Sequence, residues 1–226
     1  MSFQGFGPQA LPFFKALAFH QTKEWFEANR EIYETEIKGP MGDLVEDVAA
    51  RLAKAKIPIR GDRKSSLFRI HRDVRFANNK DPYKTNAGVA LSRSGTKSDA
   101  GVLYFHLSPD ECFFAAGFYM PDPHELARLR GSAVRSAKAF RRMTAKLAKA
   151  GLALSDEDAM KRPPRGLEGM DAPDIAAAAR FRNFVCRRAV TEAAVGTPEL
   201  VTSFCAFAKD SLPLLKWGWD ALTETR

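Results

Sequence analysis

The sequence has few cysteines and no long apolar stretch. Its three cysteines, Cys112, Cys186 and Cys205, are widely spaced and form no CxxC pair. A disulfide framework or a structural zinc site is therefore not expected, and a reducing cytoplasm is the natural setting. The longest apolar run, Cys112 to Met120, is far shorter than the roughly 20 residues of a membrane-spanning helix. We expect no membrane partner, and the N-terminal residues show no signal-peptide pattern.

The common catalytic and cofactor motifs are also missing. No Walker-type loop, G-x-G-x-x-G or G-x-S-x-G sequence occurs. The four histidines, His20, His71, His106 and His124, lack the spacing of metal ligands. The sequence thus predicts no metal and no cofactor.

The length and composition of the chain indicate a single folded domain over residues 1–226. The chain has 226 residues, of which 45% are hydrophobic and 27% charged, so it can bury a sizeable core. Its net charge of +8 is localised, because no acidic residue lies between Leu126 and Ser155, whereas eight basic residues do. The remainder of the chain is neutral, with 35 − 8 = 27 basic against 27 acidic residues. A localised excess of this kind favours an anionic partner.

Hydrophobic periodicity predicts an α+β fold, with an antiparallel β-meander flanked by N-terminal and C-terminal helices. Apolar spacing and turn signals give the expected helices as 11–19, 23–38, a helix after Gly39-Pro40, 123–150 with an interruption at Gly131, 173–181, one opening at Thr197-Pro198, and 214–223. The expected strands are 67–76, 87–92, 102–107, 111–119 and 184–190.

The segment from Arg69 to Lys84 is the most informative part of the sequence. If it is a strand, alternate side chains share a face. Phe68, Ile70, Arg72, Val74 and Phe76 would then lie on one face, and Arg69, His71, Asp73 and Arg75 on the other. Because a guanidinium is not buried alone, Arg72 in the apolar row predicts a bonded carboxylate or several carbonyls.

These residues predict a site for a small anionic ligand that carries phosphate or carboxylate, because guanidinium groups offer paired donors to such oxygens. The ligand-binding candidates are Arg69, Arg72, Asp73, Arg75, Lys80, Tyr83 and Lys84. Asp73 is the one catalytic candidate, as a base or as a group that orients an arginine. Two alternatives stay open: the segment is an ordinary solvated face with weak ion pairs, or its charges pair internally in a structural role. The reaction, if there is one, does not follow from the sequence.

The same segment resembles a bacterial family of unknown function, domain of unknown function 2461. The shared pattern is Arg-x-x-Arg-Asp-x-Arg-Phe followed by Asp or Asn, Lys and Tyr, here Arg69, Arg72, Asp73, Arg75, Phe76, Asn79, Lys80 and Tyr83. Further matches are Trp25-Phe26, Tyr104, Gly117-x-Tyr119-x-Pro121 and Pro163-Pro164-x-Gly166, so the resemblance spans nearly the whole chain. After Pro173 the alanine-rich stretch departs from the family's leucine-rich pattern. The resemblance implies a shared α+β fold and brings no activity with it.

A second candidate surface lies on the helix expected after Pro121. Six basic side chains fall within an arc of about 80° at the helical period, namely Arg128, Arg135, Lys138, Arg142, Lys146 and Lys149. Leu126, Leu129, Ala133, Ala137, Phe140, Thr144 and Leu147 lie opposite them. This ridge predicts binding to nucleic acid or another polyanion as the alternative function. The competing interpretation is a solvated helix face, and no aromatic residue interleaves the charges for base stacking.

Overall fold

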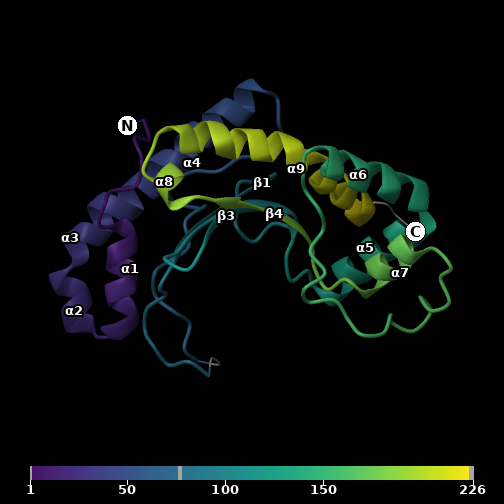
Figure 1. Cartoon of the computed structure of the whole chain (residues 1–226), viewed down its shortest axis with the longest axis horizontal. Coiled ribbons are helices and arrows are strands. Elements are labelled where there is room, and N and C mark those ends of the chain that lie inside the picture. Colours follow the sequence, from purple (N-terminus) through teal and green to yellow (C-terminus); the bar gives the residue numbers. More distant parts are fainter. Residues whose placement is uncertain (1, 76–77, 224–226) are drawn as a thin grey trace. The chain divides into compact units, whose positions relative to one another are not determined.

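The computed structural model describes residues 2–75 and 78–223 and confirms the α+β class. Its four-stranded antiparallel sheet has the order β1-β2-β3-β4, with helices before and after it in the chain (Figure 1). The strands are β1 (Ala87–Ser92), β2 (Val102–Leu107), β3 (Cys112–Phe118) and β4 (Phe184–Val190). All four were predicted from the sequence, three of them with the observed ends.

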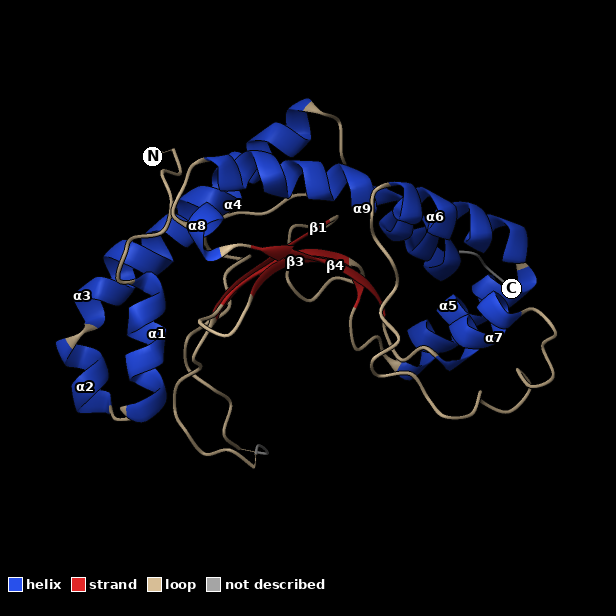
Figure 2. Ribbon diagram, in the orientation of Figure 1, coloured by secondary structure: helices blue, strands red, loops and turns tan. Residues whose placement is uncertain are grey.

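The helices are drawn in blue in Figure 2. They are α1 (Ala10–Phe19), α2 (Lys23–Ala28), α3 (Arg30–Ile32), the π-helix η1 (Tyr33–Lys38), α4 (Gly39–Lys54), α5 (Pro123–Arg135), α6 (Ala137–Lys149), α7 (Pro173–Arg180), α8 (Glu192–Val195) and α9 (Glu199–Thr223). The chain forms two compact units. Unit 1 consists of Met1–Asp99, Leu103–Phe114 and Ala189–Ala206, and unit 2 of Ala100–Val102, Ala115–Arg188 and Phe207–Arg226.

The N-terminal helices of unit 1 depart from the single helix expected over residues 23–38. Thr22 caps α2 as predicted, because its Oγ1 accepts a hydrogen bond from the Trp25 N–H at 3.2 Å. The helix breaks at Asn29, whose side-chain amide donates to the Trp25 carbonyl at 2.9 Å and so competes with the backbone. The chain then passes through η1 directly into α4. The predicted boundary at Gly39-Pro40 is confirmed, because η1 ends at Lys38 and α4 begins at Gly39 with Pro40 in its first turn, where a missing N–H is tolerated.

Helix α4 positions the first strand of unit 1. Its predicted apolar stripe is buried throughout, as Met41, Leu44, Val45, Val48 and Leu52 show. The helix packs against β1. Burying one large aliphatic side chain contributes roughly 1.5–3 kcal/mol, so this stripe is a main support of the sheet.

The two faces of β2 differ in burial. Leu103, Phe105 and Leu107 are buried, and the Phe105 ring meets Phe204 of α9 at a centroid distance of 6.1 Å. Tyr104 and His106 alternate with them and are half-buried. Phe68 lies in the long connection from α4 to β1, next to the Arg69–Lys84 segment, and its ring contacts the Tyr104 ring. This part of the connection therefore lies on the Tyr104 face of β2.

The expected strand over 67–76 is wrong. In the described part of this segment only isolated bridges occur, between Leu67 and Val89 and between His71 and Tyr83. Around the second bridge, Arg72 N donates to Pro82 O and Lys84 N donates to Ile70 O, each at 2.8 Å. Pro82 faces Arg72 and has no N–H to return the bond, so the ladder stops there. Phe76, the last residue of the expected strand, lies outside the described residues.

In unit 2, the long basic helix is two helices, and they separate at Ser136 rather than at Gly131. Gly131 is buried inside α5. Leu129, Ala133, Phe140 and Leu147 are buried as predicted, whereas Leu126, Ala137 and Thr144 are only half-buried. Asp122 and Glu125 form a capping box at the start of α5.

Helix α9 is continuous, although two helices were expected on either side of Pro213. A proline inside a helix costs about 3 kcal/mol because it removes one backbone hydrogen bond and crowds the preceding turn. Leu214 and Leu215 directly follow it and are fully buried. Burial of two leucines is of the size needed to offset that cost.

Candidate functional site

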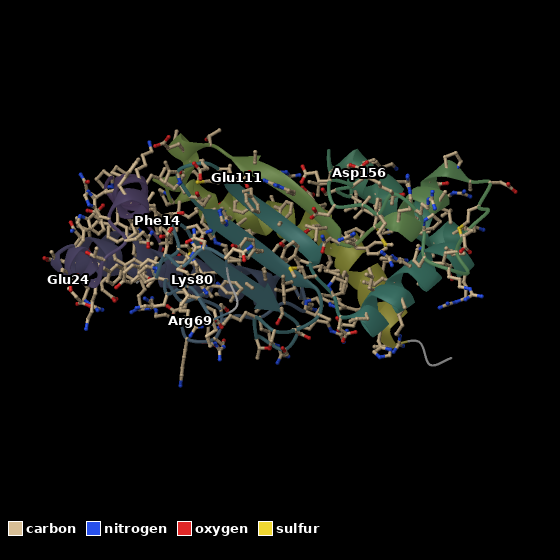
Figure 3. All side chains as sticks on the ribbon, turned by 90° about the horizontal axis from the view of Figure 1, so that it is seen from below. Phe14, Glu24, Arg69, Lys80, Glu111 and Asp156 are labelled. Atoms are coloured by element: carbon tan, nitrogen blue, oxygen red, sulfur yellow. The ribbon has the colours of Figure 1, made fainter. Side chains whose placement is uncertain are left out.

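The candidate site of unit 1 is the loop between α4 and β1, which includes the Arg69–Lys84 segment. Figure 3 labels Arg69 and Lys80 within it. Residues 69–84 hold five Lys or Arg and two Asp, so the formal charge of the segment is 5 − 2 = +3. The bridge between His71 and Tyr83 joins the two ends of the Arg69–Lys84 segment.

Asp73 is committed to the arginines of its own loop. Its carboxylate accepts hydrogen bonds from Arg75 Nε at 3.0 Å and Arg75 Nη2 at 2.7 Å, and Arg69 Nη2 lies 3.9 Å away. The side-chain hydrogen bonds from Arg75, and then its backbone N–H, hold the pKa of Asp73 well below its usual range. Asp73 thus holds the Arg75 guanidinium in place, and its part in a site stays a prediction. A carboxylate with so low a pKa makes a poor general base near neutral pH.

Tyr83 packs against α2 and against His71 of its own loop. Its ring is buried and stacks on Phe26 at a centroid distance of 4.5 Å with an interplanar angle of 11°. Burial raises the pKa of the Tyr83 hydroxyl. Lys80 in turn donates to the Val74 carbonyl at 2.9 Å, within its own loop. The structure therefore directs Tyr83 and Lys80 to different partners from those of Asp73.

Arg72 has fewer partners than the sequence predicted. Its Nη2 donates to the Tyr83 carbonyl at 3.3 Å. Its Nε is buried and has no hydrogen-bond partner among residues 2–75 and 78–223. The sequence predicted a carboxylate or several carbonyls as partners of Arg72. Among the described residues, its guanidinium pairs with no carboxylate and donates to one carbonyl only. A buried donor without a partner costs about 1–3 kcal/mol, which makes it ready to bind an acceptor.

Lys84 is a half-buried cation beside two others. Its ammonium lies 5.7 Å from the centre of the Phe68 ring, and no carboxylate in the described part of the chain forms an ion pair with it. Burial lowers the pKa of Lys84, and the positive charges of Arg69 and Arg72 lower it further. We call Arg69, Arg72 and Lys84 the Lys84 cation group.

Aromatic residues border this group, and the sequence analysis did not assign them to the site. Phe68 is 37% exposed and meets the Tyr104 ring edge-on at 6.0 Å. Tyr104 Oη and His106 Nδ1 share a hydrogen bond of 3.0 Å. Lys97, from the turn between β1 and β2, places its ammonium 5.9 Å from the Phe68 ring centre. The alternation along β2 places Tyr104 and His106 on one face, whereas no local signal in the sequence points to Lys97.

The basic ridge of unit 2 is divided between two helices. Arg128 and Arg135 belong to α5, whereas Lys138, Arg142, Lys146 and Lys149 belong to α6 and are all exposed. Two other basic residues of the stretch have internal roles. Arg141 binds Asp174 through bonds of 2.6 and 3.0 Å, and the buried Arg130 donates to the Phe181 carbonyl at 2.8 Å. The predicted six-residue ridge therefore becomes a stripe of four cations on α6.

The fold and this loop define an α+β protein with a basic, partly aromatic surface beside an antiparallel sheet. A family model described as conserved hypothetical protein (DUF2461) matches residues 9–217, and the chain belongs to that family. No curated protein and no solved structure matches the chain. Among the described residues, no helix is long and apolar enough to cross a membrane, and no group of His, Cys, Asp and Glu could hold a metal ion.

Proposed function

We propose that the protein binds a small anion, bearing phosphate or carboxylate, at the Lys84 cation group. The observation that carries this proposal is the half-buried Lys84 ammonium next to Arg69 and Arg72, with no carboxylate partner in the described residues. Like charges held together in a partly desolvated place raise the free energy of the folded state. A bound anion removes that repulsion.

Donor geometry also supports an anion at this place. Arg72 keeps a buried Nε–H that has no acceptor in the part of the chain described, and Arg69 is 69% exposed with only a 3.9 Å contact to Asp73. Guanidinium donors suit the paired oxygens of phosphate or carboxylate, and an ammonium adds a mobile point charge. In this account Asp73 holds Arg75 beside the site and takes no proton. A binding role is enough to explain the group, and no reaction is assigned.

The test is a calorimetric titration of inorganic phosphate at low ionic strength. Lys84→Met removes the central charge and keeps most of the side chain's bulk. We expect its affinity for phosphate to fall at least tenfold, about 1.4 kcal/mol. Lys64→Met is the matched control, because Lys64 is an exposed residue of the same loop and its loss changes the net charge equally. Equal phosphate affinity in Lys84→Met and the native protein would reject the proposal.

A second candidate function is supported by the α6 stripe of Lys138, Arg142, Lys146 and Lys149. These exposed cations follow a spacing of three and four residues, and the opposite face of α6 is buried through Phe140, Met143 and Leu147. We propose this stripe as a contact surface for the backbone of a nucleic acid. If it contacts four phosphates, affinity for duplex DNA should fall roughly a hundredfold between 50 and 200 mM salt. Arg142→Glu should abolish that binding, and a flat salt response excludes the stripe.

The cytoplasm is the compartment that we propose for this protein. Cys112, Cys186 and Cys205 are all buried, and Cys112 and Cys186 are free thiols, which suits a reducing environment. A thiol assay in denaturant on protein taken directly from cells should detect three reduced thiols. Detection of fewer would contradict a reducing compartment.

A further inference from the structure

We infer that the anion at the Lys84 cation group is a phosphate attached to a planar aromatic ring, as in a nucleotide, and that this ring stacks on Phe68. The inference rests on the proposed function and adds the chemical class of the ligand. Its basis is the combination of an exposed aromatic ring, two lysine ammoniums close to that ring and a second aromatic side chain at its edge.

Phe68 is one of few large apolar side chains that are exposed in the described structure. It is 37% exposed, whereas most of the phenylalanines that the structure describes are buried. An exposed phenylalanine leaves apolar area in water that a flat ligand can cover. A surface aromatic beside basic residues is also the arrangement with which proteins hold the bases of single strands.

The two lysines near the ring are held differently. Lys97 donates a hydrogen bond to the Ser65 carbonyl at 3.1 Å, which fixes its ammonium beside Phe68. The Lys84 ammonium lies over the same ring and forms no hydrogen bond or ion pair with the described residues. An exposed cation–π contact contributes little compared with a charge-assisted bond to phosphate. A phosphate would therefore draw Lys84 away and leave room on the ring for a base.

Tyr104 supplies an ordered border to this surface. Its ring meets Phe68 at an interplanar angle of 71°, and its hydroxyl is bonded to His106. Gly88 on β1 makes room for that hydroxyl, because a Cβ at this position would lie 2.4 Å from Tyr104 Oη. The Phe68 ring is thus bordered by a tyrosine whose position its neighbours fix, and such preorganised aromatic groups bind flat rings with a small entropic cost.

The experiment compares four probes by calorimetry: inorganic phosphate, ribose 5-phosphate, adenosine 5′-monophosphate and a short oligothymidylate. We expect the adenosine monophosphate to bind at least about tenfold more tightly than ribose 5-phosphate, within the range of base–aromatic stacking. Phe68→Leu keeps an apolar side chain and should erase that difference. Phe68→Tyr restores a ring and should keep it.

Each outcome has a distinct meaning. If no probe binds, the proposed anion site is wrong, and the inference falls with it. If all probes bind equally, the anion site stands and the ring is not recognised. An advantage for the adenosine monophosphate that persists in Phe68→Leu also overturns the inference, because the base then stacks elsewhere. Tighter binding of the oligothymidylate than of the mononucleotide would support the inference and identify single-stranded nucleic acid as the source of the ring.

Discussion

Asp73 binds Arg75 through both carboxylate oxygens, at 3.0 Å to Nε and 2.7 Å to Nη2, and both side chains are exposed. Their side chains are 44% and 75% exposed. Exposed ion pairs add little to stability, because water screens the charges and the side chains lose freedom when they pair. The most prominent pair of the motif is thus poorly placed for a purely architectural role.

The first prediction follows from that pair. Asp73→Ala should leave the midpoint of urea unfolding almost unchanged, because neither charge is buried when its partner is removed. Circular dichroism during urea titration measures this. Asp73→Asn serves as the control, since it removes the charge and keeps the shape. A large drop in the midpoint for both variants would instead support the structural alternative for the motif.

The second prediction concerns the protonation of Lys84. Burial and the charges of Arg69 and Arg72 lower its pKa in the folded protein. The unfolded chain then binds the Lys84 proton more tightly than the folded protein does. The charged Lys84 therefore destabilises the fold at low pH, and stability rises as the pH passes the lowered pKa of Lys84 in the folded state. A bound phosphate favours the charged form and should raise the pKa of Lys84.

Carbon NMR of the Lys84 side chain during a pH titration measures that pKa directly. We expect a value below the ordinary lysine value in phosphate-free buffer and a rise on phosphate addition. Removal of one neighbouring charge, in Arg69→Met, should also raise it. A Lys84 pKa that phosphate leaves unchanged would show that no anion is bound next to this ammonium.

The third prediction tests the contact between β3 and β4 in unit 2. Gly117 has φ +135, and a Cβ there would lie 2.0 Å from the Phe184 carbonyl oxygen. Gly117→Ala should destabilise the protein by roughly 2–4 kcal/mol, because both strain and a backbone clash are introduced. Thermal unfolding measures the loss.

Gly166→Ala is the matched control for Gly117→Ala. Gly166 also has a positive φ, of +86, but open space surrounds the position of its Cβ. Only the conformational cost of about 1–2 kcal/mol then applies. Equal losses in the two variants would mean that the close approach of Phe184 does not matter.

The fourth prediction concerns Tyr33 in η1 and alkaline pH. Burial, and then the charge of Glu34, raise the pKa of Tyr33 to about 12. An unfolded tyrosine ionises near pH 10, so the unfolded state loses its proton first and stability falls as the pH rises from about 10 to 12. Tyr33→Phe should flatten that part of the pH–stability curve, as measured by urea unfolding at several pH values. An unaltered slope would show that Tyr33 is not the group that titrates.

Much of the sheet could be predicted from the sequence, because alternating apolar residues and flanking turn residues are local features of each strand. In β2, apolar residues alternate with Tyr104 and His106, and turn residues lie at both ends. The helix breaks and extensions were not predictable in this way. Leu214 and Leu215 are fully buried, and this burial offsets the cost of Pro213 inside α9. Burial depends on neighbours far away in the sequence, so it could not be predicted from local signals.

The candidate loop shows the same limit. Residues 67–76 have the alternation of a strand. Pro82 lies opposite Arg72 and ends the strand pairing. Local alternation does not show which residue lies opposite Arg72. The basic character of the segment could be predicted from the sequence. The contacts of Lys84 and Lys97 with Phe68 could not, because they depend on how two separate connections fold against each other.

The measurement that most directly tests the central claim is a crystal structure of the protein grown with phosphate at low ionic strength. The account predicts a phosphate within hydrogen-bond distance of Lys84 Nζ and an Arg72 guanidinium nitrogen, with the Lys84 ammonium moved away from the Phe68 ring. A structure in which Lys84 stays on Phe68, and any phosphate binds only elsewhere, would contradict it.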